Sequence, residues 1–161
     1  MVGWLRSADE LELGRDLTVA ERSAIAIGQL RQAEQLMRER YLHHPTSAKR
    51  WTAARTLGQL DPAQMRDEWT EELARRLGYD RSATVRRAII EALGNVAHQT
   101  PRAHRELTAC CEDPDESVRA AAMRALCVSE SFTPLDAEVL VLHLDDPVPA
   151  VRHAAMQARG T

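Results

Sequence analysis

Aromatic residues are scarce in this chain of 161 residues, where they make up 4% of the composition. A β-sheet is normally rich in aromatic and β-branched side chains, so this scarcity argues against a sheet. Lys49 is the sole lysine, and the formal net charge of −3 provides no overall attraction to polyanions or anionic membranes. Alanine and leucine carry most of the apolar content, which favours thin, closely packed helices.

Motifs that would indicate an enzyme or a metal site are also missing. The chain has no P-loop, no G-x-G-x-x-G and no G-x-S-x-G, so neither phosphate binding by such a loop nor a nucleophilic serine is predicted. Its histidines form neither HExxH nor a zinc-type pair with cysteine, so we expect no metal and no cofactor. Cys110, Cys111 and Cys127 lack a CxxC spacing and are expected to be buried, reduced thiols. We therefore expect a non-enzymatic protein.

Long apolar runs are absent as well. Gly3-Trp4-Leu5 is followed at once by Arg6 and Ser7, which is too short for a signal peptide, and no window reaches the length of a membrane span. These features favour a cytoplasmic protein that makes no membrane contact.

What the chain does contain is a repeat marked by glycine. Gly28, Gly58, Gly94 and Gly160 fall at equivalent points of similar segments, and Cys127 takes that place in the fourth copy. A period of about 33 residues is typical of helical repeat proteins. Apolar residues recur every three or four positions, as on one face of an α-helix. The segments carrying this register, called B segments, are predicted helices at 18–30, 49–60, 85–96, 118–128 and 151–160.

A second set of periodic segments, called A segments, alternates with the B segments. The A segments are 4–13, 30–42, 63–77, 102–111 and 135–144. The pattern predicts an all-α fold of about ten helices in five antiparallel pairs. We expect one domain over residues 1–161, with repeats at approximately 3–29, 30–60, 61–97, 98–130 and 131–161.

The most regular part of the repeat is an Asp-Pro turn followed by Val-Arg and a run of alanines. In the fourth copy Asp113-Pro114 precedes Val118-Arg119 and three alanines. This unit resembles the HEAT repeat, and in particular the short bacterial form found in phycobilisome bilin lyases. The resemblance implies a right-handed α-solenoid of about five HEAT-like pairs. It is specific for the fold and carries little information about function, because such repeats serve in many unrelated systems.

An aspartate and an arginine recur six residues apart in three of the copies. The pairs are Asp80 and Arg86, Asp113 and Arg119, and Asp146 and Arg152. Their repetition could be taken for a catalytic or phosphate-binding feature. The HEAT resemblance implies instead that each aspartate binds the arginine of its own or the adjacent copy, in a structural stack.

The B segments carry a net positive charge, whereas the rest of the chain is strongly acidic. The resemblance implies that B helices line the concave face of the solenoid, which would then be basic. Trp51, Arg55, Arg87, Arg124 and His153 occupy positions expected to point into this groove. For Trp51, packing in the core is the alternative interpretation.

Three functions fit this surface. We expect a protein-interaction scaffold that binds a partner with an acidic surface along the B helices. Nucleic-acid binding is the second interpretation, by resemblance to HEAT-like alkylpurine DNA glycosylases, although this chain has no aromatic cluster that matches their pocket. A role as a chromophore-lyase subunit or chaperone is the third and rests on the family resemblance alone.

One apolar run in the last repeat bears on assembly. Val139, Leu140, Val141 and Leu142 make the last A segment apolar on all sides, whereas a terminal repeat normally has a polar outer face. The run predicts either a well-buried helix or a hydrophobic end that forms a homodimer through Val139, Leu140 and Leu142.

Overall fold

The computed structural model describes residues 19–97, 100–128 and 133–159, and within these ranges it is built from helices without strands. The α-helices are α2 (Val19–Arg38), α3 (Ser47–Gly58), α4 (Asp67–Leu77), α5 (Ala83–Leu93), α6 (Pro101–Ala109), α7 (Glu116–Val128), α8 (Pro134–Leu142) and α9 (Pro149–Arg159). Short 3₁₀ helices are η1 (Tyr41–His43), η2 (Pro62–Gln64), η4 (Cys110–Glu112) and η5 (His143–Asp145).

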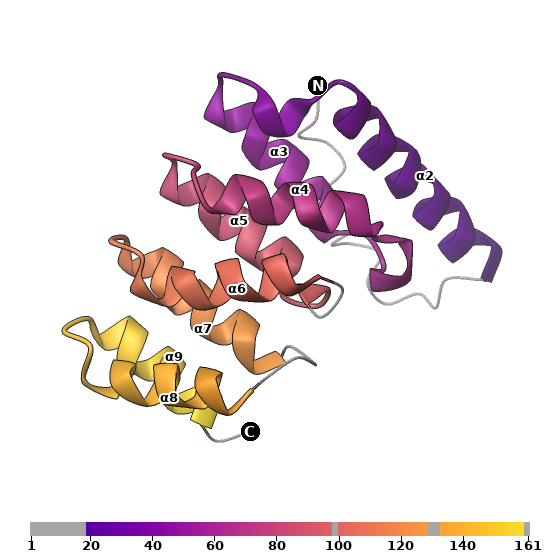
Figure 1. Cartoon of the computed structure of the whole chain (residues 1–161). Coiled ribbons are helices and arrows are strands. Elements are labelled where there is room, and N and C mark those ends of the chain that lie inside the picture. The colour runs from indigo at the N-terminus through magenta and orange to yellow at the C-terminus, as the bar shows by residue number, and fades with distance from the viewer. Residues whose placement is uncertain (1–18, 98–99, 129–132, 160–161) are drawn as a thin grey trace.

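The helices form two layers. The B helices, which are α3, α5, α7 and α9, pack against one another in chain order, and the A helices α4, α6 and α8 each pack against the B helix that follows. Figure 1 shows this succession from α3 at one end to α8 and α9 at the other. Helix α2 packs on α3 and runs at an angle to the other helices (Figure 1). Each repeat is therefore covered mainly by its neighbours in sequence.

The prediction of ten helices in five pairs is wrong in its first part. The described ranges hold eight α-helices in four pairs, and the A segment predicted at 4–13 lies outside them. The described residues of the predicted helix 18–30 and most of the predicted helix 30–42 form one continuous helix, α2, so the repeat boundary between residues 29 and 30 falls inside it. No Asp-Pro turn separates the two segments, and Gly28 alone costs only about 1 kcal/mol in a helix interior, too little to end it.

Local signals start the later helices where the chain turns. The side chains of Ser82, Thr100 and Thr133 each accept a hydrogen bond from a backbone N–H in the first turn of α5, α6 and α8. Pro101 and Pro134 occupy the first turns of α6 and α8, where a missing N–H costs nothing. These caps satisfy donors that a helix start leaves unpaired.

The core lies between the layers, and close helix approach explains one register glycine. Trp69, Leu73 and Leu77 on α4 are buried, and so is Met65, which lies just before this helix. A Cβ atom on Gly58 would come within 3.1 Å of Ala92, because α3 and α5 almost touch there. A Cβ atom on Gly94 would make ordinary contacts, one on Gly28 would meet open space, and Gly160 lies outside the described residues. The repeated glycine therefore has no single packing role.

Candidate functional site

A ladder of arginine–aspartate pairs joins each of the B helices α3, α5 and α7 to the turn of the next repeat. Each arginine donates from Nε and Nη2 to the two carboxylate oxygens. The pairs are Arg50–Asp80 at 2.7 and 3.0 Å, Arg86–Asp113 at 2.7 and 2.8 Å, and Arg119–Asp146 at 3.1 and 3.2 Å. Such two-bond contacts are strong and fix direction as well as distance. In these pairs the guanidinium and carboxylate groups bind each other, so they are not available to bind a phosphate or a substrate.

The same arginines also hold the turns of their own repeats. Nη1 donates to the backbone carbonyl six residues earlier, from Arg86 to Asp80 at 2.9 Å, from Arg119 to Asp113 at 2.9 Å, and from Arg152 to Asp146 at 2.7 Å. An aspartate and the arginine six residues after it are therefore in contact through the backbone carbonyl of the aspartate and not through its carboxylate. The carboxylate of each aspartate binds the arginine of the preceding repeat.

Arg50 is a ladder residue that the Asp–Arg spacing missed. Its own turn carries His44-Pro45 where the later turns carry aspartate, and its Nη1 donates to the His44 carbonyl at 2.9 Å. The signal was present in the sequence, because Arg50 is the register equivalent of Arg86 and Arg119.

Asp80 is the most heavily bonded carboxylate of the ladder. Besides Arg50 it accepts hydrogen bonds from Arg76 Nε at 2.6 Å and from the Ser82 N–H at 2.9 Å, and its side chain is fully buried. Burial by itself raises the pKa of Asp80, but the hydrogen bonds from Arg50, Ser82 and Arg76 outweigh it and hold the pKa below the ordinary value. The carboxylate is therefore charged and saturated with donors.

The structure brings the five residues predicted for partner contact onto one side of the B helices. Trp51, Arg87 and His153 each follow a ladder arginine by one residue, and Arg55 and Arg124 follow one by five. Positions one and five share a helix face because they are four residues apart. Arg87, Arg124 and His153 are exposed, whereas Trp51 and Arg55 are half-buried. We call this surface, spanning α3 to α9, the B face.

The B face is less basic than the sequence count predicts. Four B-helix arginines belong to the ladder. Their guanidinium groups bind the turns between helices and do not contribute to the charge of the B face. Of the remaining ones, Arg55 stacks over the ring of Trp51 at 5.2 Å, and Arg87 lies 3.7 Å from Glu91. Arg124 makes no ion pair with any residue that the structure describes. Arg124 therefore offers the least compensated charge of the face.

A shallow hollow of about 190 Å³ lies on this face between α3 and α5. It is lined by Arg55, Gly58, Gln59, Ala88, Glu91 and Ala92. Sequence reasoning missed Glu91, although its position four residues after Arg87 was a sufficient signal. Arg55 and Glu91 place opposite charges beside one small apolar floor, as an interaction surface with a polar partner requires.

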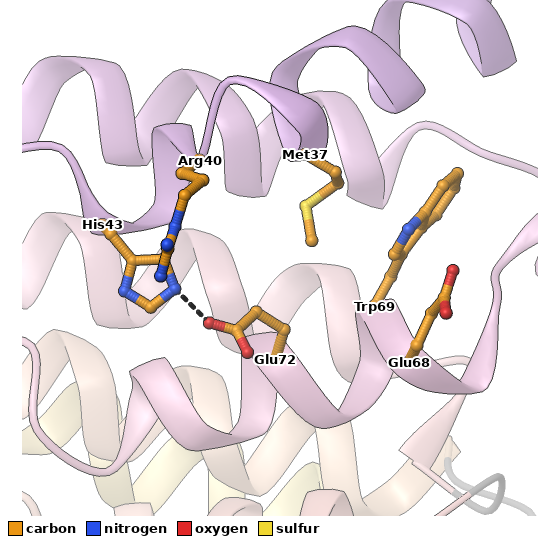
Figure 2. A pocket seen from close by; sticks show the side chains of 6 residues that line it. All are labelled: Met37, Arg40, His43, Glu68, Trp69 and Glu72. Atoms are coloured by element: carbon orange, nitrogen blue, oxygen red, sulfur yellow. Dashed lines mark ion pairs between the residues drawn. The ribbon is translucent and has the colours of Figure 1, made fainter.

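A second hollow, of about 320 Å³, lies between α2 and α4 and was not predicted. It is lined by Met37, Arg40, His43, Glu68, Trp69 and Glu72. Figure 2 shows these side chains around it, with the ion pair between His43 and Glu72 drawn. A guanidinium and an imidazole lie on one side of the hollow and two carboxylates on α4 line the other, so the lining carries no single sign of charge. The sequence pattern does not indicate this hollow, because the repeat does not specify that α2 and η1 lie beside α4.

Arg40 has the one positive φ angle, 55°, among the non-glycine residues of the described ranges. It follows the C-terminus of α2, where a left-handed residue is usually glycine or asparagine. The side chain of Arg40 extends over the hollow from its α2 side (Figure 2). This backbone turn is what sets η1 and α3 at an angle to α2.

The metal-ligating side chains and the thiols of the described residues have the following surroundings. In the described part of the chain no three His, Cys, Asp or Glu side chains gather as ligands for a metal ion. Burial raises the pKa of Cys110 and of Cys111 to about 12, so neither is a nucleophilic thiolate at neutral pH. None of the described helices combines the length and the apolar character needed to cross a membrane.

The apolar run on α8 divides between core and surface. Leu140 is 3% exposed and packs in the core, so the prediction that it forms part of a dimer surface is wrong. Val139 is partly buried against the core, whereas Leu142 is 74% exposed and Val141 54%. The helix packs by one face on its neighbours. Residues two apart in an α-helix point to nearly opposite sides, so Leu140 faces the core and Leu142 faces away from it.

These features define a protein built from stacked helix pairs with an arginine–aspartate ladder. A family model described as HEAT repeats matches residues 67–159, which is more than half of the chain. The chain therefore belongs to the HEAT repeat family. Proteins of this family generally act as protein-interaction scaffolds and are typically not enzymes. No curated protein sequence matches the chain significantly.

Proposed function

We propose that this protein is a non-enzymatic interaction scaffold that binds an acidic surface of a partner protein along the B face. The single observation that carries the proposal is the gathering of Trp51, Arg55, Arg87, Arg124 and His153 on one side of four successive helices. In this proposal the helix pairs form a right-handed solenoid, so that the contacts of successive repeats add along one extended surface.

The chemistry of the face supports a protein partner more than a nucleic acid. Its exposed cations are few and are interleaved with Glu91, whereas a phosphate backbone is normally met by a continuous row of cations. The stacked pair of Arg55 and Trp51 combines a planar cation with an aromatic ring. Arginine and tryptophan are the side chains that most often dominate the free energy of binding at protein interfaces.

Charge reversal at Arg87 tests the proposal. Its contact with Glu91 is exposed and contributes little to stability, so Arg87→Glu leaves the fold intact. Arg105→Glu is the matched control, because Arg105 is an exposed arginine on α6, away from the B face. A partner is first captured from the native host with the wild-type chain, and its Kd is then measured for the three proteins.

We expect Arg87→Glu to weaken binding at least about tenfold and Arg105→Glu to leave it unchanged. Equal affinity of all three proteins would refute the B face as the binding surface. Retardation of a DNA duplex at low salt is measured in parallel. Tight binding with a steep dependence on salt would replace the protein partner by a nucleic acid.

A further inference from the structure

Three arginines of the described residues lie over an aromatic ring, and one of the three binds no carboxylate there. Two of these guanidinium groups also form an ion pair; they are Arg66 over Trp69, which binds Glu34, and Arg76 over Tyr79, which binds Asp80. Arg55 lies over the ring of Trp51 at 5.2 Å, but it forms no ion pair or hydrogen bond with any residue that the structure describes. The arrangement of ring, arginine and carboxylate is therefore incomplete at Arg55.

The shape of a guanidinium group allows a ring and a carboxylate to be bound together. The ring covers the flat face of the group, whereas the five N–H donors point outward in its plane. A carboxylate can therefore accept two hydrogen bonds from the edge without displacing the ring. At Arg55 the ring of Trp51 covers the face, and no described residue accepts from the edge.

Arg55 also needs a counter-charge more than the other cations of the B face do. Arg87 and Arg124 are exposed, so water surrounds and stabilises their charges. Arg55 is half-buried, and a charge that is partly withdrawn from water is costly unless an opposite charge is near. Arg55 is therefore a cation placed to bind an anion from outside the described part of the chain.

The hollow beside Arg55 limits the size of that anion. Gly58, Ala88 and Ala92 have small side chains, and they leave a space of about 190 Å³ between α3 and α5. Pockets that enclose a whole small molecule usually measure roughly 300–1,000 Å³. The space thus suits a single side chain, whose methylene groups the glycine and the alanines can cover.

Glu91 favours a protein carboxylate over a phosphate backbone. It lines the hollow from α5, its side chain is 60% exposed, and it lies 3.7 Å from Arg87. A row of phosphates along the B face would pass this carboxylate and be repelled by it. A single carboxylate at Arg55 meets only this one negative charge, which Arg87 partly compensates.

We propose that this hollow, called the Arg55 hollow, receives one aspartate or glutamate side chain of the partner protein. The carboxylate binds the edge of the Arg55 guanidinium while Trp51 covers its face, and the methylene groups lie on the floor of small residues. The inference rests on the proposed function and specifies the side chain by which the partner is anchored. A partly enclosed arginine that takes up one side chain is the kind of contact that dominates binding at protein interfaces.

A small probe tests the Arg55 hollow without a partner. Glutamate capped as its N-acetyl N-methylamide is titrated into the wild-type chain, and NMR follows the Nε–H signals of Arg55, Arg105 and Arg124. We expect the Arg55 signal to saturate at a concentration at least about tenfold lower than the other two, since these arginines are exposed and have no ring beneath them. Capped glutamine should leave the Arg55 signal unchanged. Equal saturation of the three signals would overturn the proposal, and so would tighter binding of inorganic phosphate than of capped glutamate.

Replacement by lysine separates the Arg55 hollow from the B face as a whole. Arg55→Lys keeps the charge but loses the flat group with its paired donors, and Arg87→Lys is the same exchange at an exposed position. With the partner used for Arg87→Glu, we expect Arg55→Lys to weaken binding at least about tenfold and Arg87→Lys to leave it unchanged. Unchanged binding by Arg55→Lys would refute the hollow, even where Arg87→Glu upholds the B face. If Arg87→Glu has no effect, the proposed function fails, and the titration with capped glutamate still decides whether the hollow takes a carboxylate.

Discussion

Replacing Asp80 by asparagine is the sharpest test of the ladder as a stabilising element. Asp80 accepts two hydrogen bonds from Arg50, one from Arg76 and one from the Ser82 N–H, at distances between 2.6 and 3.0 Å. Asparagine keeps the size of the side chain but removes its charge. Arg50, whose side chain is only 8% exposed, is then left without a counter-charge.

The magnitude follows from the burial of the pair. Removing one partner of a buried ion pair costs about 3–5 kcal/mol, because the remaining charge is left uncompensated. The amide oxygen of asparagine still accepts one bond, so we expect the free energy of unfolding to fall by about 3 kcal/mol. Asp146→Asn is the internal comparison, since the bonds from Arg119 are longer, at 3.1 and 3.2 Å, and its loss should be smaller.

Urea unfolding followed by far-ultraviolet circular dichroism measures both variants. A loss below about 1 kcal/mol for Asp80→Asn would refute the assignment, because surface ion pairs already contribute up to that much. An equal or larger loss for Asp146→Asn would refute the ranking by hydrogen-bond number and length.

The same variant predicts a pH dependence with a definite sign. The pKa of Asp80 is lower in the folded chain than the value of about 3.9 in an unfolded one, so its stabilisation is complete above that value. It is lost as the pH falls through the lower pKa of the folded state. The wild-type chain should therefore lose more stability than Asp80→Asn between about pH 4 and pH 2. A stability difference that stays constant over this range would contradict the explanation.

Further predictions concern packing, backbone and thiols. Gly28→Ala should raise the free energy of unfolding by about 0.5–1 kcal/mol, since its Cβ meets open space in an exposed helix. Gly58→Ala should lower it, because helices α3 and α5 must move apart; a stable variant would disprove that contact. Arg40→Gly should be stabilising by up to about 1 kcal/mol at its φ of 55°, which chemical denaturation measures. Cys110 and Cys111 should resist a thiol reagent in the folded chain at pH 8 and react once it is unfolded, because burial raises the pKa of each to about 12.

Much of the fold could be predicted because each repeat is a local unit. The apolar spacing within 85–96 and 118–128 specifies helices α5 and α7, and the Asp-Pro turns specify where the chain reverses. The failure at α2 has a physical reason. The sequence around Gly28 carries the helical period but no turn signal, and a period alone does not say where a helix ends.

The candidate surfaces were only partly visible in the sequence. The positions of Arg87, Arg124 and His153 on one face follow from helical spacing, since the register aligns successive B helices. The neutralising contact of Arg87 with Glu91 and the burial of Leu140 required packing to be known. The hollow between α2 and α4 joins segments whose contact no repeat pattern specifies.

The repeat, its helical period and its membership of the HEAT family follow from residues close together in the chain, so they could be predicted without a structure. The partner that each ladder residue takes depends instead on contacts between repeats. A six-residue spacing could place Asp113 with Arg119, yet its carboxylate binds Arg86 of the preceding repeat. That choice depends on how one repeat lies on the next.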